Sequence, residues 1–258
     1  MARDNFTACM AEIFAHEGGY VDHPKDPGGA TKMGITIGTL RDWRGGPVTR
    51  DDVRSLTKRE AETIYRARYW NPVRGDDLRQ GVDLVALDPA VNSGVRRGVQ
   101  WLQRAVGATA DGKMGPATLT AANDATPVDA IKRACAVRMG FLRGLRTWST
   151  FGRGWSARVA RVEAVALRMA AESIGAQARP VLIEEKDRAT QQARREAQTA
   201  SGTAAAGGGG FTFADIPEWA LIGGGILLAL AIINMIGRRR HDLARAAAMQ
   251  QVAEEAKP

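Results

Sequence analysis

The sequence predicts an all-α fold with a minor β-hairpin and one C-terminal transmembrane helix. Apolar residues recur at helical spacing in almost every segment of residues 1–175. Strand-like patterning is confined to the stretch TKMGITIGTL at residues 31–40, which fits a short hairpin. Residues 216–236 are almost entirely apolar, and a helix over them would span roughly 31 Å, the thickness of a bilayer's hydrocarbon core.

The predicted helices follow one another through residues 1–175. The first is FTACMAEIFAH at residues 6–16. The second, TKREAETIYRARYW at residues 57–70, opens with a capping box formed by Thr57 and Glu60. The turn ADGKMGPATL leads into a helix whose first residue is Pro116, a position that suits proline. The other helical patterns lie at residues 76–92, 96–106, 127–145 and 157–173.

The chain changes character after residue 175. Residues 176–215 are polar and end in a Gly-rich stretch, so we expect a solvated helix followed by a flexible linker. Residues 216–236 form the predicted transmembrane helix, with Trp219 at one interface and the basic and polar tail of residues 237–258 beyond the other. The positive-inside rule then keeps the tail in the cytoplasm and places residues 1–215 outside.

The predicted span also sets the expected location. We expect a single-pass inner-membrane protein whose folded region acts in the periplasm. The N-terminal stretch MARDNFTACMAEIF has no apolar signal-peptide core, so retention in the cytoplasm is the alternative. The GGG at residues 223–225 allows close helix approach, which favours self-association through the span.

Charge and composition narrow the class of partner. The formal net charge is +8, which suits an anionic partner. No helix-turn-helix, zinc-finger or RNA-binding pattern is present, so we do not expect nucleic acid to be that partner. Cys9 and Cys135 lie far apart in apolar helical contexts, and the three histidines lack ligand spacing, so we expect no metal and no other cofactor.

The stretch after the first predicted helix carries candidate catalytic residues. Glu17 is followed by two glycines that could simply end the helix, and then by Asp22, Asp26 and Thr31. Hydrolysis of a glycosidic bond needs a carboxylic acid that protonates the leaving oxygen, usually with a second carboxylate to activate water or stabilise the transition state. A glutamate at a helix end beneath a polar loop fits the first role. Asp22 and Asp26 compete for the second.

Three blocks of the sequence resemble one family. EGGYVDHPKDPGGATKMGIT looks like the signature of glycoside hydrolase family 108 lysozymes, and AETIYRARYWNPVRGDDL and GVDLVALDPAVNSGVRRGVQWLQRAVG are similar to later family blocks. GVQWLQRAVGATADGKMGPATLTAAN resembles the helical peptidoglycan-binding region that follows in that family. The resemblance covers about residues 5–172 and implies a lysozyme-like helical fold, N-acetylmuramidase activity and Glu17 as the catalytic acid. Similarity to phage-type lysozymes adds Asp26 and Thr31, although Thr31 falls one residue short of their spacing.

Further residues are candidates for binding the sugar polymer. They are Tyr20, Asp22, Gly29, Tyr69, Trp70 and Asn92. Glycine lets the backbone approach a glycan closely. Tyr69 and Trp70 end an amphipathic helix, where an aromatic pair serves either the core or a sugar platform. Asn92 either contacts sugar or caps the helix before Gly94.

The sequence therefore predicts an endolysin-like, membrane-anchored peptidoglycan hydrolase. Glu17 would protonate the β-1,4 bond between N-acetylmuramic acid and N-acetylglucosamine, while Asp26 or Asp22, with Thr31, positions the attacking water. A lytic transglycosylase is the alternative enzyme, and a non-catalytic wall-binding module is the alternative outside catalysis. The expected regions are a catalytic region at 5–95, a peptidoglycan-binding region packed on it at 96–175, a polar helix and linker at 176–215, the span at 216–236 and the tail at 237–258.

Overall fold

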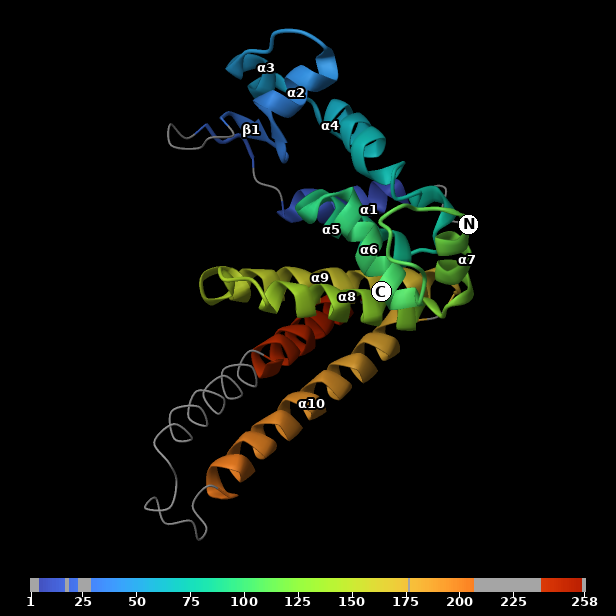
Figure 1. The fold of residues 1–258 in the computed structure, drawn as a ribbon, viewed down its shortest axis with the longest axis vertical. Coiled ribbons are helices and arrows are strands. Elements are labelled where there is room, and N and C mark those ends of the chain that lie inside the picture. Colours follow the sequence, from blue (N-terminus) through green and yellow to red (C-terminus); the bar gives the residue numbers. More distant parts are fainter. Residues whose placement is uncertain (1–4, 17–18, 23–28, 176, 207–237, 257–258) are drawn as a thin grey trace. The chain divides into compact units, whose positions relative to one another are not determined.

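The computed structural model describes residues 5–16, 19–22, 29–175, 177–206 and 238–256 (Figure 1). Contacts divide the chain into two units, Met1–Val137 and Arg138–Pro258, and each is described by itself. Glu17, Asp26 and the predicted span at residues 216–236 lie outside the described residues. Among those described, no helix combines the length and the apolar character needed to cross a membrane.

The described residues of the first unit are mostly helical with one small hairpin, which confirms the predicted secondary-structure class. Its helices are α1 (Phe6–His16), α2 (Ile37–Arg44), α3 (Arg50–Ser55), α4 (Lys58–Tyr65), the π-helix η1 (Arg66–Trp70), the 3-10 helix η2 (Gly75–Asp77), α5 (Val82–Ser93), α6 (Val95–Val106), α7 (Pro116–Asp124) and most of α8 (Pro127–Arg143). Pro116 begins α7, as its fixed φ favours. The helix predicted over 76–92 is interrupted, because Gly81 with φ 83° starts α5 afresh.

The predicted hairpin is present but shorter than the stretch that indicated it. Strands β1 (Thr31–Lys32) and β2 (Ile35–Thr36) pair antiparallel, with Thr31 opposite Thr36. Met33 and Gly34 connect them with φ of 48° and 72°, the double positive φ of a type I′ turn. The chain becomes helical at once after β2, because the Thr36 side chain caps α2 by accepting from the backbone N–H of Thr39.

The capping box predicted at Thr57 and Glu60 is only half formed. The Thr57 hydroxyl accepts from the backbone N–H of Glu60 at 3.2 Å. The Glu60 carboxylate does not complete the box, because it binds the Arg44 guanidinium through two bonds of 2.9 and 3.0 Å. A bidentate charged pair is stronger than a bond to one backbone N–H. The complete box of this region caps α3 instead, between Thr49 and Asp52.

Helix α5 lies at the centre of the first unit. Residues 82–90 are all buried, as expected of a helix covered on every side. It packs against α1, α6, η1 and η2, and Figure 1 shows α5 and α6 side by side. The boundary predicted between residues 95 and 96 falls inside this unit, at the start of α6.

Gly98 makes the close approach of α5 and α6 possible. A Cβ at this position would lie 2.8 Å from the Ala90 nitrogen and 3.0 Å from its Cα, so one backbone would have to shift. Gly98→Ala is therefore expected to lower the free energy of unfolding by about 1–3 kcal/mol. Gly140→Ala in α8 is the matched control: its new Cβ meets nothing within 4 Å, so the better helix propensity of alanine should raise stability. Urea unfolding of the full chain measures both, and a Gly98→Ala variant as stable as the wild type would contradict the close approach.

The second unit contains the end of α8, α9 (Trp148–Ser173), α10 (Ala178–Ala206) and a further helix over residues 238–255. Helix α10 packs on α9 and covers most of the polar stretch for which a helix was predicted. The basic and polar tail, for which no helix was predicted, is helical over residues 238–255. It is helical because Ala248, Met249, Val252 and Ala253 recur at helical spacing and are buried.

Polar contacts tie the helix of residues 238–255 to α9. Arg245 Nε donates to both Glu163 carboxylate oxygens, at 3.1 and 3.0 Å. The two side chains are only 14% and 2% exposed, so this pair is buried. A second pair, Arg161 with Glu255 at 2.8 Å, is more exposed.

Candidate active site

Helix α1 brings the chain to the candidate acid. It ends at His16, directly before Glu17. Cys9, Met10 and Ile13 are fully buried on its inner side, so packing fixes the helix that precedes the predicted catalytic residue.

A buried carboxylate also anchors the start of α1 to α5. Asp83 accepts from the Asn5 side chain at 2.8 Å and from the backbone N–H groups of Gly81 and Leu84 at 2.8 and 2.7 Å. These bonds connect the residue before α1 to the first turn of α5. Burial raises the pKa of Asp83 to about 6, although its hydrogen bonds act to lower it.

This raised pKa makes stability depend on pH with a definite sign. The folded value lies above the ordinary value of 3.8, so the contribution of Asp83 to stability is complete below that value and is lost as pH rises through about 6. Between about pH 4 and pH 7 we expect the wild type to lose about 2–3 kcal/mol relative to Asp83→Asn, which cannot titrate. Urea unfolding of both proteins across this range measures the difference. A constant difference would show that Asp83 titrates alike in the folded and unfolded chains.

Four predicted site residues, Tyr20, Asp22, Gly29 and Thr31, lie close together beside strand β1. The Tyr20 hydroxyl donates to Asp22 Oδ2 at 3.3 Å. Val21 and Thr31 exchange two backbone hydrogen bonds of 2.8 Å, which places the Tyr20–Asp22 stretch beside β1. The Thr31 hydroxyl donates to the Gly29 carbonyl at 3.1 Å. Gly29 has φ +66°, a conformation that favours glycine.

Two arginines of α3 complete this group, and the sequence did not single them out. Arg50 Nε lies 3.2 Å from Asp22 Oδ2, and the Arg54 guanidinium lies 4.8 Å from the centre of the Tyr20 ring. The second contact has cation–π geometry. No local signal identifies these arginines, because they are about 30 residues away from their partners in an ordinary charged helix. We call Tyr20, Asp22, Thr31, Arg50 and Arg54 the loop cluster.

Tyr69 and Trp70, the predicted aromatic pair, lie in different surroundings. Tyr69 is half-buried and its ring lies 5.4 Å from that of Tyr65, which in turn meets Phe14 of α1 edge-on at 5.6 Å. Tyr69 therefore belongs to an aromatic row that reaches the end of α1. Trp70 is completely buried, edge-on to Phe6 at 5.3 Å. Its ring has no face open to a sugar, so the structure places Trp70 in the core.

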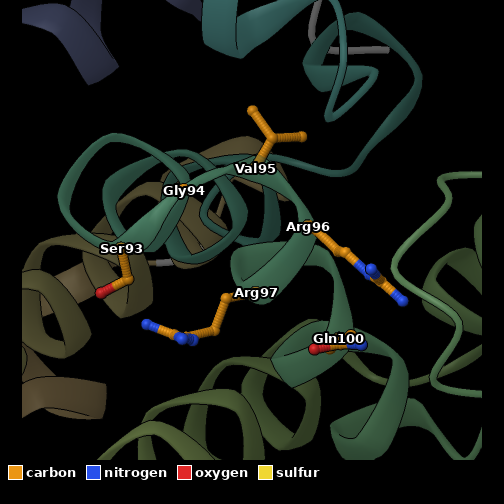
Figure 2. Close-up of a pocket in the computed structure, with 6 residues that line it drawn as sticks. All are labelled: Ser93, Gly94, Val95, Arg96, Arg97 and Gln100. Atoms are coloured by element: carbon orange, nitrogen blue, oxygen red, sulfur yellow. The ribbon is translucent and has the colours of Figure 1, made fainter.

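Asn92 lies at the exposed end of α5 beside an open pocket. Gly94, not Asn92, is the C-cap of α5. The pocket has a volume of about 470 Å³ and is lined by Ser93, Gly94, Val95, Arg96, Arg97 and Gln100. Figure 2 shows the Arg96 and Arg97 side chains extending to opposite sides of the start of α6. The arginine pair gives this pocket a positive rim that sequence reasoning missed, although SGVRRG shows it once the helix boundary is known.

The histidines and cysteines form no metal or redox centre among the described residues. In the described ranges, no group of three or more His, Cys, Asp or Glu side chains is placed to hold a metal ion. Cys9 and Cys135 are free and buried, and burial raises the pKa of the Cys9 thiol. His241 lies in the second unit, where burial lowers its pKa to about 3.

Comparison with known proteins places these features in a family. The sequence model of glycosyl hydrolase 108 matches residues 10–94, and that of a predicted peptidoglycan domain matches residues 97–160. The solved structure of SagA from Brucella abortus is 49% identical, with a TM-score of 0.59, and the match covers 66% of this chain and 97% of that one. No curated protein matches significantly.

A mostly helical fold with one small hairpin, matched by a hydrolase model and a peptidoglycan model, defines the class as glycoside hydrolases of the cell wall. Within that class, the chain belongs to the glycosyl hydrolase 108 family.

Proposed function

We propose that the chain is an N-acetylmuramidase that cleaves the β-1,4 bond between N-acetylmuramic acid and N-acetylglucosamine, with Glu17 as the general acid. The observation that carries this proposal is the family match over residues 10–94, which includes Glu17 and the whole loop cluster. The match to a peptidoglycan domain in the residues that follow supports the same polymer as substrate.

The loop cluster supports a division of roles between the two other carboxylates. Asp22 already contacts Tyr20 and Arg50, so its side chain is engaged within the segment. We therefore assign the positioning of the attacking water to Asp26 first and keep Asp22 as its competitor. The backbone pair between Val21 and Thr31 holds Thr31 beside Tyr20 and Asp22. We assign to the Thr31 hydroxyl an assisting role in positioning the attacking water. The arginines of α3 add positive charge for the carboxylates of the cell-wall polymer.

Product analysis tests the reaction. The full chain is incubated with purified sacculi, and the released muropeptides are identified by mass spectrometry after reduction. A muramidase gives products with reducing N-acetylmuramic acid ends. Anhydro ends would show a lytic transglycosylase instead. Binding to sacculi without release of soluble products would show a non-catalytic wall-binding module.

Membrane attachment is a separate proposal that rests on the sequence of residues 216–236. We propose that this apolar segment anchors the chain in the inner membrane, with hydrolysis taking place in the periplasm and with self-association through the same segment. The contacts in the second unit set a condition on this proposal. A chain that crosses once at residues 216–236 has α9 on one side of the bilayer and residues 238–255 on the other. The Glu163–Arg245 pair therefore belongs to a state in which the segment has not crossed.

A further inference from the structure

Three aromatic side chains gather on the first two turns of α9. Trp148, Phe151 and Trp155 are three and four residues apart, a spacing that puts them on one side of a helix. The Trp155 ring centre lies 5.7 Å from that of Phe151 and 6.2 Å from that of Trp148, with the planes tilted by 30° and 43°. We call these three rings the aromatic surface.

The local backbone is adapted to this arrangement. A Cβ on Gly152 would lie 2.7–2.9 Å from atoms of the Trp148 ring, so only glycine lets that ring lie against the helix. Phe151 is 53% exposed, while the two tryptophans are half-buried. Exposed apolar side chains that cluster mark binding surfaces more often than isolated ones do.

Cations accompany the rings. Arg146 and Arg153 are exposed, and within the described part of the chain neither forms an ion pair or a hydrogen bond. Because both side chains are exposed, an external anion can reach them. The ring centres of Trp148 and Trp155 lie only 6.2 Å apart, so the rings form one compact surface.

We propose that the aromatic surface is a binding platform for peptidoglycan, separate from the loop cluster. Sugar rings present C–H groups on their faces, which pack on aromatic rings, while their hydroxyls stay in water. Stem-peptide and lactyl carboxylates supply the negative charge that Arg146 and Arg153 would meet. The proposal rests on the proposed function for its substrate, and the match to a peptidoglycan domain at residues 97–160 includes all three rings.

Binding to sacculi tests the platform without depending on hydrolysis. The full chain carrying Glu17→Gln is co-sedimented with purified sacculi over a range of protein concentrations. Phe151→Ala is expected to raise the Kd about three- to tenfold, and Phe151→Tyr should keep it near the starting value because a stacking ring remains. Ile174→Ala is the matched control, since Ile174 is 77% exposed in the same unit and away from the rings. Arg153→Glu should weaken binding at low salt and have less effect at high salt.

Each outcome decides the proposal. Unchanged binding by both Phe151→Ala and Arg153→Glu would overturn it. If the variants lost binding to vesicles of anionic lipid but still bound sacculi, the surface would be one that contacts a membrane, and the proposal would also be overturned. If circular dichroism showed Phe151→Ala to be unfolded, Arg153→Glu alone would decide. Failure of the proposed function would appear elsewhere, as a wild-type chain that releases no soluble products from sacculi.

Discussion

Glu17→Gln is expected to lower the rate of cell-wall hydrolysis by about 100-fold to 10,000-fold, the usual contribution of a general acid. Glutamine has nearly the same shape and can still accept hydrogen bonds, but it has no acidic proton to give to the leaving oxygen. Glu17 directly follows α1, whose inner side chains are fully buried, so the backbone before it is held in place by the core. Clearing of a sacculus suspension by the full chain measures the effect.

Two controls separate loss of chemistry from loss of structure. The thermal unfolding midpoint of Glu17→Gln should match that of the wild type. Asp22→Asn and Asp26→Asn test the assignment of the second carboxylate, and we expect the larger loss for Asp26→Asn because Asp22 is engaged with Arg50. Wild-type clearing by Glu17→Gln would exclude the proposed mechanism, whatever the other variants do.

Local patterns predicted most of the helices. The helix at residues 6–16 was predicted with the bounds that α1 has, because every third or fourth residue is apolar and the pattern stops at two glycines. The hairpin was predicted from the strand-like stretch TKMGITIGTL at residues 31–40. The helix over residues 238–255 was not predicted. Its arginines indicated a basic tail, and the apolar residues around Met249, which are buried, were not recognised as a helical pattern.

Contacts between distant segments could not be predicted. Nothing near Glu60 shows that Arg44 takes its carboxylate away from the capping box. Tyr69 and Trp70 are neighbours in one helical pattern, so the sequence does not separate them. Trp70 is in the core because Phe6 and Gly75 both pack closely against its ring. The loop cluster depends in the same way on α3, whose arginines reach back to Tyr20 and Asp22. In each case the partner is set by tertiary packing, which a single sequence without an alignment does not reveal.

Arg245→Met is expected to destabilise the second unit by about 3 kcal/mol, because it leaves the carboxylate of Glu163 buried without this cation. In a domain of this size that corresponds to a fall in unfolding temperature of roughly 6–12 °C. Arg161→Met is the matched control. It removes the same charge from the same interface, but its pair with Glu255 is more exposed, so it should cost no more than about 1 kcal/mol.

A double variant separates the ion pair from the packing around it. Glu163→Leu combined with Arg245→Met removes both charges, and we expect it to recover most of the stability lost by Arg245→Met alone, since buried pairs can be replaced by apolar residues at little cost. Equal stability of Arg245→Met and the wild type, measured on the full chain, would mean that residues 238–255 do not dock on α9.

The same variant reports on the topology of the chain in a membrane. If residues 216–236 cross once, Glu163 and Arg245 are on opposite sides of the bilayer, and Arg245→Met cannot affect the unfolding of the inserted protein. If both flanks stay on one side, the loss of about 3 kcal/mol persists after insertion. Protease protection of tags at the two ends of the chain gives an independent readout of the same choice. A stability loss in detergent-free solution that vanishes on insertion would show that crossing the membrane requires the C-terminal helix to leave α9.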